Sequence, residues 1–97
     1  MSFADKVAII TGAGGGLGRE HALLLAEAGA RVVVNDLGGS VDGSGQGDAA
    51  DTVVEEIRSA GGEAVANKDS VSDRDGARRI VETAVKEYGT VDILINN

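Results

Sequence analysis

The stretch TGAGGGLGRE, residues 11–20, contains five glycines in seven consecutive positions. Each glycine in regular structure costs about 0.5–1 kcal/mol relative to alanine, because its backbone loses more freedom on folding. An apolar run precedes the stretch and a helix-like pattern follows it. So many glycines at one corner indicate either a very tight turn or a ligand that approaches the backbone closely.

Short apolar segments rich in β-branched residues alternate with amphipathic segments along the chain. We predict strands over 7–10, 31–36, 63–67 and 91–96. We predict helices over 17–28, 48–60 and 73–88, which Gly29, Gly61 with Gly62, and Gly89 would end. This alternation is typical of βαβ units with a parallel sheet. The predicted fold class is α/β, the N-terminal half of a Rossmann-type doubly wound sheet, β-α-β-α-β-α-β with strand order 3-2-1-4.

Helical spacing also predicts which residues face the core. The apolar face predicted for the first helix is Leu17, His21, Leu24, Leu25 and Ala28, that of the second is Ala50, Val53, Val54 and Ile57, and that of the third is Ala77, Ile80, Val81, Ala84 and Tyr88. Ser72 is the predicted N-cap of the third helix. The last strand would leave one edge of the sheet open, so we expect either missing strands or pairing with another chain.

The composition restricts the class of protein. The chain has 97 residues, a net charge of −7 and no cysteine. An acidic chain is a poor partner for nucleic acid, whose phosphates attract Lys and Arg, and for anionic membrane surfaces. Without cysteine no disulfide or thiolate metal site can form, and His21 has no second histidine with which to share a metal. We expect residues 1–97 to form part of one domain of a cytoplasmic protein, with no metal, nucleic-acid or membrane partner.

The spacing of the glycines narrows what the corner can bind. A helix N-terminus presents unpaired N–H groups and the positive end of its dipole, which together favour an anion. Neither a P-loop nor a G-x-G-x-x-G fingerprint fits, whereas Gly12, Gly16 and Gly18 give T-G-x-x-x-G-x-G. We predict that these glycines make room for a diphosphate, that the Leu17 N–H binds phosphate while its side chain packs inward, and that the remaining two glycines are filler.

Asp36 ends the second predicted strand, 18 residues after Gly18. A carboxylate there would accept hydrogen bonds from both hydroxyls of an adenosine ribose and would repel a 2′-phosphate. Gly15 offers no positive charge to neutralise such a phosphate. NAD is therefore predicted over NADP, and the alternative is that Asp36 merely begins a turn.

Three further segments follow predicted strands and therefore lie at the same edge of a parallel sheet. Asp69 and Ser70 are candidates for the adenine, although Asp69 also suits a loop or cap. Asn96 would lie near the nicotinamide ribose or tie neighbouring loops together. The stretch LGGSVDGSGQG, residues 37–47, is either a flexible connection or a loop that borders the ligand.

These motifs together resemble the short-chain dehydrogenase/reductase family. The resemblance rests on TGAGGGLG, the aspartate of VVVND, the KDSV loop and the final NN, which matches the first half of the family's N-N-A-G motif. More narrowly, VVVNDLGGS and AADTVVEEIRSAGGEAVANKDSV are similar to the (3R)-hydroxyacyl-CoA dehydrogenase region of multifunctional β-oxidation enzymes. The match spans the whole chain.

The resemblance implies a role for each matching position. It assigns the diphosphate to Gly12, Gly16, Leu17 and Gly18, the ribose to Asp36 and Leu37, the adenine to Asp69 and Ser70, and the nicotinamide side to Asn96. The family's catalytic serine and Tyr-x-x-x-Lys would lie beyond residue 97. Tyr88 cannot replace that tyrosine, because Asp92 stands where the lysine should be.

Two functional hypotheses follow. The first is an NAD-dependent oxidoreductase that acts on a small-molecule secondary alcohol or ketone, with 3-hydroxyacyl-CoA as one candidate, and of which this chain is the cofactor-binding half. The second is a non-catalytic nucleotide-binding or association module that completes its sheet as a homo-oligomer. A sugar-nucleotide epimerase-like protein fits less well, because its fingerprint usually differs at this corner.

Overall fold

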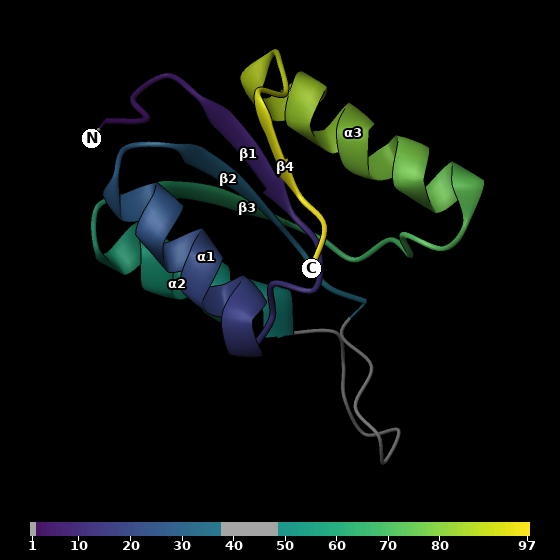
Figure 1. Ribbon diagram of the computed structural model, residues 1–97, viewed down its shortest axis with the longest axis horizontal. Helices are drawn as coiled ribbons and strands as arrows, with labels where there is room; N and C mark the ends of the chain where they lie inside the picture. The colour runs from purple at the N-terminus through teal and green to yellow at the C-terminus, as the bar shows by residue number, and fades with distance from the viewer. Residues whose placement is uncertain (1, 38–48) are drawn as a thin grey trace.

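The computed structural model describes residues 2–37 and 49–97. The described residues form strands and helices in strict alternation (Figure 1). In chain order these are β1 (Val7–Ile10), α1 (Gly16–Glu27), β2 (Arg31–Asn35), α2 (Ala49–Ser59), β3 (Glu63–Asn67), α3 (Arg74–Tyr88) and β4 (Ile93–Ile95). The predicted order of elements is confirmed, and the boundaries differ from the prediction by at most two residues.

The strands form one parallel sheet in the order β3-β2-β1-β4. Ile9 of β1 is in register with Val33 of β2 on one side and with Leu94 of β4 on the other. This is the predicted Rossmann-type α/β arrangement. Because all strands run the same way, their carboxyl ends lie together at one end of the sheet, the carboxyl edge, where β1 leads into the glycine corner.

Helices cover both faces of the sheet, with α1 and α2 on one face and α3 on the other (Figure 1). Successive strand residues point to opposite faces, so Ile10 and Val34 pack with α1 and α2, whereas Ile9 and Val33 pack with α3. All of these side chains are buried. Strands buried on both faces explain the runs of Val and Ile in the sequence.

The buried face of α1 differs from the predicted one. Leu17 is 70% exposed and Leu24 is 63% exposed, so the prediction that they face the core is wrong. The buried residues are Gly18, Ala22 and Ala26, which follow each other at intervals of four. Small residues on this face let the helix backbone lie close to the sheet, which leaves the larger leucines at the flanks and outside.

The other two helices agree better with their patterns, although Val81 of α3 is 47% exposed, so the prediction that it faces the core is wrong. In α2 the buried residues are Ala50, Val53, Val54 and Ile57, as predicted. In α3 the N-cap is Asp73, whose carboxylate accepts a hydrogen bond from the Asp75 N–H, so the prediction of Ser72 is wrong by one residue. Gly89 ends α3 in the left-handed conformation with φ of 88°.

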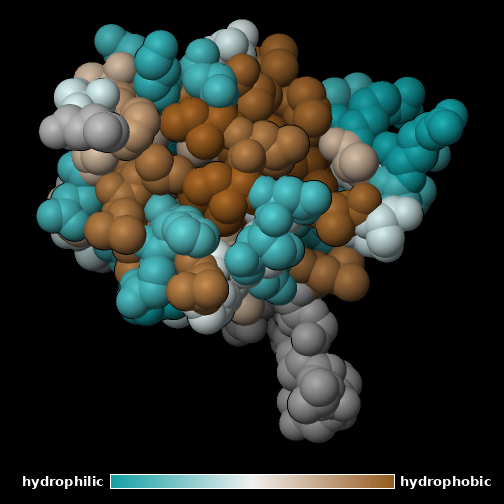
Figure 2. Space-filling model, in the orientation of Figure 1, coloured by the Kyte–Doolittle hydropathy of each residue, from teal (hydrophilic) through white to brown (hydrophobic). Residues whose placement is uncertain are grey.

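Strand β4 lies at an edge of the sheet and is covered less than its neighbour β1. Leu94 is in register with Ile9, yet Leu94 is 63% exposed whereas Ile9 is 1% exposed. Figure 2 shows apolar surface gathered over β4 on the face turned to the viewer. The predicted open edge is therefore present in the described part of the chain.

Candidate functional site

The glycines of the β1–α1 corner are required by its backbone. Gly12 and Gly16 have φ of 63° and 58°, a left-handed conformation that side chains disfavour. At Gly18 a Cβ atom would lie 2.3 Å from the carbonyl oxygen of Gly12, which is closer than atoms can approach. The T-G-x-x-x-G-x-G pattern thus corresponds to two left-handed positions and one close contact between the helix and the loop.

Helix α1 begins without a side-chain cap. Its N-cap is Gly15 in an extended conformation, and its first turn contains no acidic residue. By contrast, α3 has both a capping aspartate and an acidic residue in its first turn. The first N–H groups of any α-helix lack acceptors within the helix, so this corner offers donors to an anion. The side chain of Leu17 points outward at 70% exposure, which corrects the prediction that it packs inward.

Asp36 follows β2 directly and reaches across to the glycine corner. Its Oδ2 atom accepts a hydrogen bond of 2.9 Å from the N–H of Gly14. A Cβ atom at Gly14 would lie 2.7 Å from that oxygen, whereas a Cβ atom at Gly15 would have no neighbour within 4 Å in the described part of the chain. The interpretation of both glycines as filler is therefore wrong for Gly14, which must lack a side chain for Asp36 to lie there.

Two buried asparagines support the segment that carries Asp69. Asn35 and Asn67 are in register at the ends of β2 and β3, and they are 2% and 7% exposed. The Asn35 Nδ2 atom donates to Asn67 Oδ1 and to the carbonyl oxygen of Asp69, each at 2.9 Å. Asn67 Nδ2 in turn donates to Asp69 Oδ2 at 2.9 Å.

The Asp69 carboxylate is also held from α3. Arg79 Nε donates to Asp69 Oδ1 at 2.8 Å, and this hydrogen bond lowers the pKa of Asp69. The loop position of Asp69 is thus as predicted. Beside it, the Oγ atoms of Ser70 and Ser72 are 2.9 Å apart, and a Cβ atom at Gly76 would lie 2.2 Å from the Ser70 carbonyl oxygen. The loop therefore packs directly on the backbone of α3.

The sequence interpretation did not include Asn35, Asn67 or Arg79. A signal for the asparagines exists, because both close an apolar strand and both precede an acidic residue by one or two positions. Two polar residues at equivalent ends of neighbouring parallel strands are expected to meet. No such signal marks Arg79, whose position depends on how α3 packs against the loop.

Asn96 and Asn97 connect the end of β4 to the glycine corner. Thr11 Oγ1 donates to Asn96 Oδ1 at 3.1 Å and accepts from the Asn97 N–H at 3.0 Å. Asn97 Nδ2 donates to the carbonyl oxygen of Gly12 at 3.3 Å. The side chain of Asn96 thus ties the end of β4 to Thr11 at the glycine corner.

Leu37, the last residue described before the gap, is 64% exposed beside Asp36. Most of the stretch 37–47, with its alternative interpretations as a connection or as a ligand loop, lies outside the described residues.

The surroundings of Tyr88 do not suit a group that transfers protons. Burial, followed by the charge of Glu63, raises its pKa, whereas a tyrosine that exchanges protons near neutral pH needs a lowered pKa. Four residues later, Asp92 Oδ2 accepts a hydrogen bond of 2.9 Å from the N–H of Val7 and so fixes the start of β4. The contacts of Tyr88 and Asp92 therefore stabilise the fold and do not form a Tyr-x-x-x-Lys pair.

The described ranges contain no cluster of three or more His, Cys, Asp or Glu residues that could hold a metal ion. None of the three described helices is long and apolar enough to cross a membrane.

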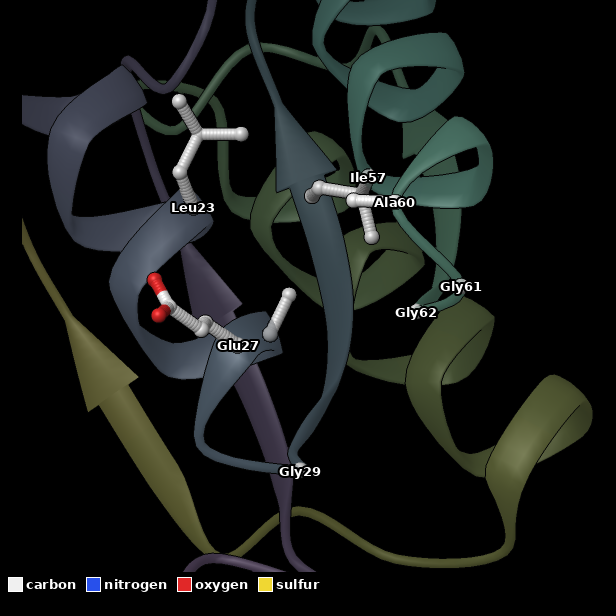
Figure 3. A pocket seen from close by; sticks show the side chains of 8 residues that line it. Leu23, Glu27, Gly29, Ile57, Ala60, Gly61 and Gly62 are labelled. Atoms are coloured by element: carbon white, nitrogen blue, oxygen red, sulfur yellow. The ribbon is translucent and has the colours of Figure 1, made fainter.

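A separate hollow lies at the amino ends of the strands, opposite the end of the sheet that carries the glycine corner. It has a volume of about 420 Å³ and is lined by the ends of α1 and α2 and the turns that follow them, as Figure 3 shows for Leu23, Glu27, Ile57 and Gly62. It shares no residue with the glycine corner. The hydrogen-bond donors and the Asp36 and Asp69 carboxylates described above lie at the carboxyl ends of the strands, away from this hollow.

A parallel sheet in this order, with a TGxxxGxG corner and an aspartate after β2, defines a Rossmann-type chain of the kind found in dehydrogenases. The sequence model of the short chain dehydrogenases matches residues 6–97, and the chain belongs to this family.

Individual relatives agree with this assignment. The chain is 60% identical to the peroxisomal hydratase-dehydrogenase-epimerase of Saccharomyces cerevisiae, over 100% of this chain and 11% of the relative. It matches the crystal structure of a short chain dehydrogenase from Mycobacterium avium with a TM-score of 0.91 and 53% identity, over 100% of this chain and 34% of the other. A 7α-hydroxysteroid dehydrogenase complexed with NADH and 7-oxo glycochenodeoxycholic acid matches with a TM-score of 0.88 and 41% identity, over 99% of this chain and 34% of the other.

The expected cytoplasmic location is contradicted by these comparisons. The yeast relative is named a peroxisomal enzyme, and so are similar multifunctional enzymes from Drosophila melanogaster, Dictyostelium discoideum and Mus musculus. The lack of cysteine, on which the expectation rested, does not distinguish the cytoplasm from an organelle.

Proposed function

We propose that this chain is the NAD-binding part of a short-chain oxidoreductase that transfers a hydride between the cofactor and a secondary alcohol or ketone. The observation that carries the proposal is the Asp36 carboxylate, held 2.9 Å from the N–H of Gly14 at the glycine corner. The carboxylate lies beside an uncapped helix N-terminus, so acceptors for a ribose and donors for a diphosphate are adjacent. We also propose that residues 1–97 belong to a single Rossmann-fold domain.

Each part of the cofactor has proposed partners. The backbone at Gly12, Gly16, Leu17 and Gly18 would hold the diphosphate, Asp36 and Leu37 the adenosine ribose, Asp69 and Ser70 the adenine, and Asn96 the nicotinamide side. The left-handed glycines and the glycine N-cap fit this assignment, because among the described residues no capping side chain binds the first N–H groups of α1. Bound NAD supplies the hydride chemistry at its nicotinamide ring.

We propose a 3-hydroxyacyl-CoA as the substrate class, on the basis of the similarity to (3R)-hydroxyacyl-CoA dehydrogenase regions. The yeast relative's name, hydratase-dehydrogenase-epimerase, is compatible with this choice. The proton transfer that accompanies hydride transfer needs an acid or base at the substrate oxygen. In the family this group is the tyrosine of Tyr-x-x-x-Lys, a motif that the only tyrosine of this sequence, Tyr88, does not form.

Replacement of Asp36 tests the cofactor assignment. In the purified protein, Asp36→Ala should weaken NADH binding by about 10-fold or more, because hydrogen bonds to a charged group are lost. Binding of NADPH should weaken less, since a negative charge that repels its 2′-phosphate is removed. Fluorescence titration of both nucleotides measures the two dissociation constants.

The matched control is Glu27→Ala, which removes the same charge beside the hollow at the opposite edge. It should leave both dissociation constants within about 2-fold, as expected of a change far from the ligand. Unchanged binding of both nucleotides to Asp36→Ala would contradict the ribose assignment.

A second candidate is a non-catalytic nucleotide-binding module that associates with a second copy. The exposed Leu94 on the edge strand β4 favours it, because an apolar open edge can pair with another chain. Analytical ultracentrifugation distinguishes the candidates. The association module should sediment as a dimer, and Leu94→Lys should dissociate that dimer. In the oxidoreductase, by contrast, association through β4 is not needed for NADH binding.

A further inference from the structure

Gly14 and Gly15 are neighbours in sequence with different surroundings. A Cβ atom at Gly14 would lie 2.7 Å from Asp36 Oδ2 and 2.7 Å from the Cβ of Ala49, whereas at Gly15 it would meet no atom of the described residues within 4 Å. Neither glycine has a positive φ, and Gly15 is fully extended with φ of −172°. Alanine is therefore compatible with the backbone conformation at both positions, and only the space around its methyl group differs.

The main chain of Asp36 cannot shift to make room for a side chain at residue 14, so only the carboxylate itself can move. The main chain of Asp36 is fixed by a hydrogen bond of 3.0 Å from its N–H to the carbonyl oxygen of Asn67. On the other side of the corner, Ala49 begins α2 and closes the remaining space beside Gly14. A methyl group at residue 14 must therefore rotate the carboxylate and break its hydrogen bond to the Gly14 N–H.

We propose that Gly14 is a specificity-determining residue, because its missing side chain and its N–H together place the Asp36 carboxylate where the adenosine ribose binds. This inference rests on the proposed function. A carboxylate has about four acceptor positions, so accepting a bond from Gly14 is compatible with accepting bonds from ribose hydroxyls. Fixed in this place, the negative charge would meet a 2′-phosphate, and Gly14 thereby favours NAD over NADP.

The test compares Gly14→Ala with Gly15→Ala in the purified protein by fluorescence titration with NADH and NADPH. Gly14→Ala should weaken NADH binding by about 10-fold and reduce the preference for NADH over NADPH, because a charge-assisted hydrogen bond is lost. Gly15→Ala should change each dissociation constant by less than about 2-fold. Equal effects of the two substitutions would overturn the inference, as would a Gly14→Ala variant that weakens NADH and NADPH binding equally.

If Gly14→Ala folds poorly, thermal unfolding of single and double variants tests the same contact without nucleotide binding. The loss of melting temperature caused by Gly14→Ala should be smaller in the Asp36→Ala background, since the displaced carboxylate is then absent. The same loss in both backgrounds would overturn the inference. Wild-type protein that binds neither nucleotide would refute the proposed function itself, whereas NADH binding that Gly14→Ala leaves unchanged would refute only the role of Gly14.

Discussion

Asn67 is the residue that joins the end of β3 to the loop after it. Its side chain accepts from Asn35 and from the Asp69 N–H, and donates to Asp69 Oδ2 and Thr83 Oγ1. Each of these partners matters to the stability of the fold, because a buried polar group left without a hydrogen bond lowers the free energy of unfolding by about 1–3 kcal/mol. The orientation of Asp69 is therefore set by β2, β3 and α3 together.

The Asp69–Arg79 pair predicts how stability responds to acid. Because the pKa of Asp69 is lowered in the folded protein, its contribution is complete above the unfolded pKa of about 4 and is lost as the pH falls through the lower folded pKa. The difference in free energy of unfolding between the wild type and Asp69→Asn should therefore shrink below about pH 4. Urea unfolding at a series of pH values from 7 to 3 measures this difference.

Arg79→Gln serves as the control for that experiment. It removes the guanidinium that chiefly lowers the pKa of Asp69, so Asp69→Asn should have a weaker pH dependence in this background. A difference between the wild type and Asp69→Asn that stays constant from pH 7 to 3 would show that the pair does not contribute in this way.

Single residues were predictable from sequence to different degrees. Asp36 was predicted as the last residue of a strand and directly follows β2, within one residue of the prediction, because an acidic residue after an apolar run is a local signal. The role of Gly14 was not predictable, since it depends on a contact with a residue 22 positions away and with the start of α2.

At the scale of elements, α1 shows where periodicity fails. Its leucines repeat at helical spacing, yet the helix buries the face of Gly18, Ala22 and Ala26 instead. Hydrophobicity scales rank leucine above alanine, whereas close packing on a sheet favours small side chains. For α2, whose large apolar residues occupy a single face, the same periodicity gave the correct buried set.

A pair of substitutions in α1 tests this packing. Ala22→Val should lower the free energy of unfolding by about 1–3 kcal/mol, because the two methyl groups that valine adds must fit into a tightly packed core. Leu24→Ala should change it by no more than about 0.5 kcal/mol, since Leu24 is 63% exposed. Chemical denaturation of both variants measures the two changes. A larger loss of unfolding free energy for Leu24→Ala than for Ala22→Val would support the buried face that periodicity predicted.

At the scale of the molecule, the two edges of the sheet differ in chemistry. The carboxyl edge gathers the glycine corner, Asp36, the Asn67 cluster and the Asn96 contacts, whereas the opposite edge has the mainly apolar hollow of Figure 3. Strand order and the polar edge were predictable from sequence, because parallel strands place their carboxyl ends together. Strand register and the α3 contacts were not, since they arise from packing between distant segments.

The most direct test of the proposed cofactor site is an NMR titration of the ¹⁵N-labelled protein with NADH. The proposal predicts that the largest amide shift changes occur at residues 12–18 and at Asp36, with smaller changes at Asp69 and Ser70. Amides around the hollow, such as those of Leu23 and Gly62, should change little. Shift changes centred on the hollow, or none at the glycine corner, would contradict the proposal.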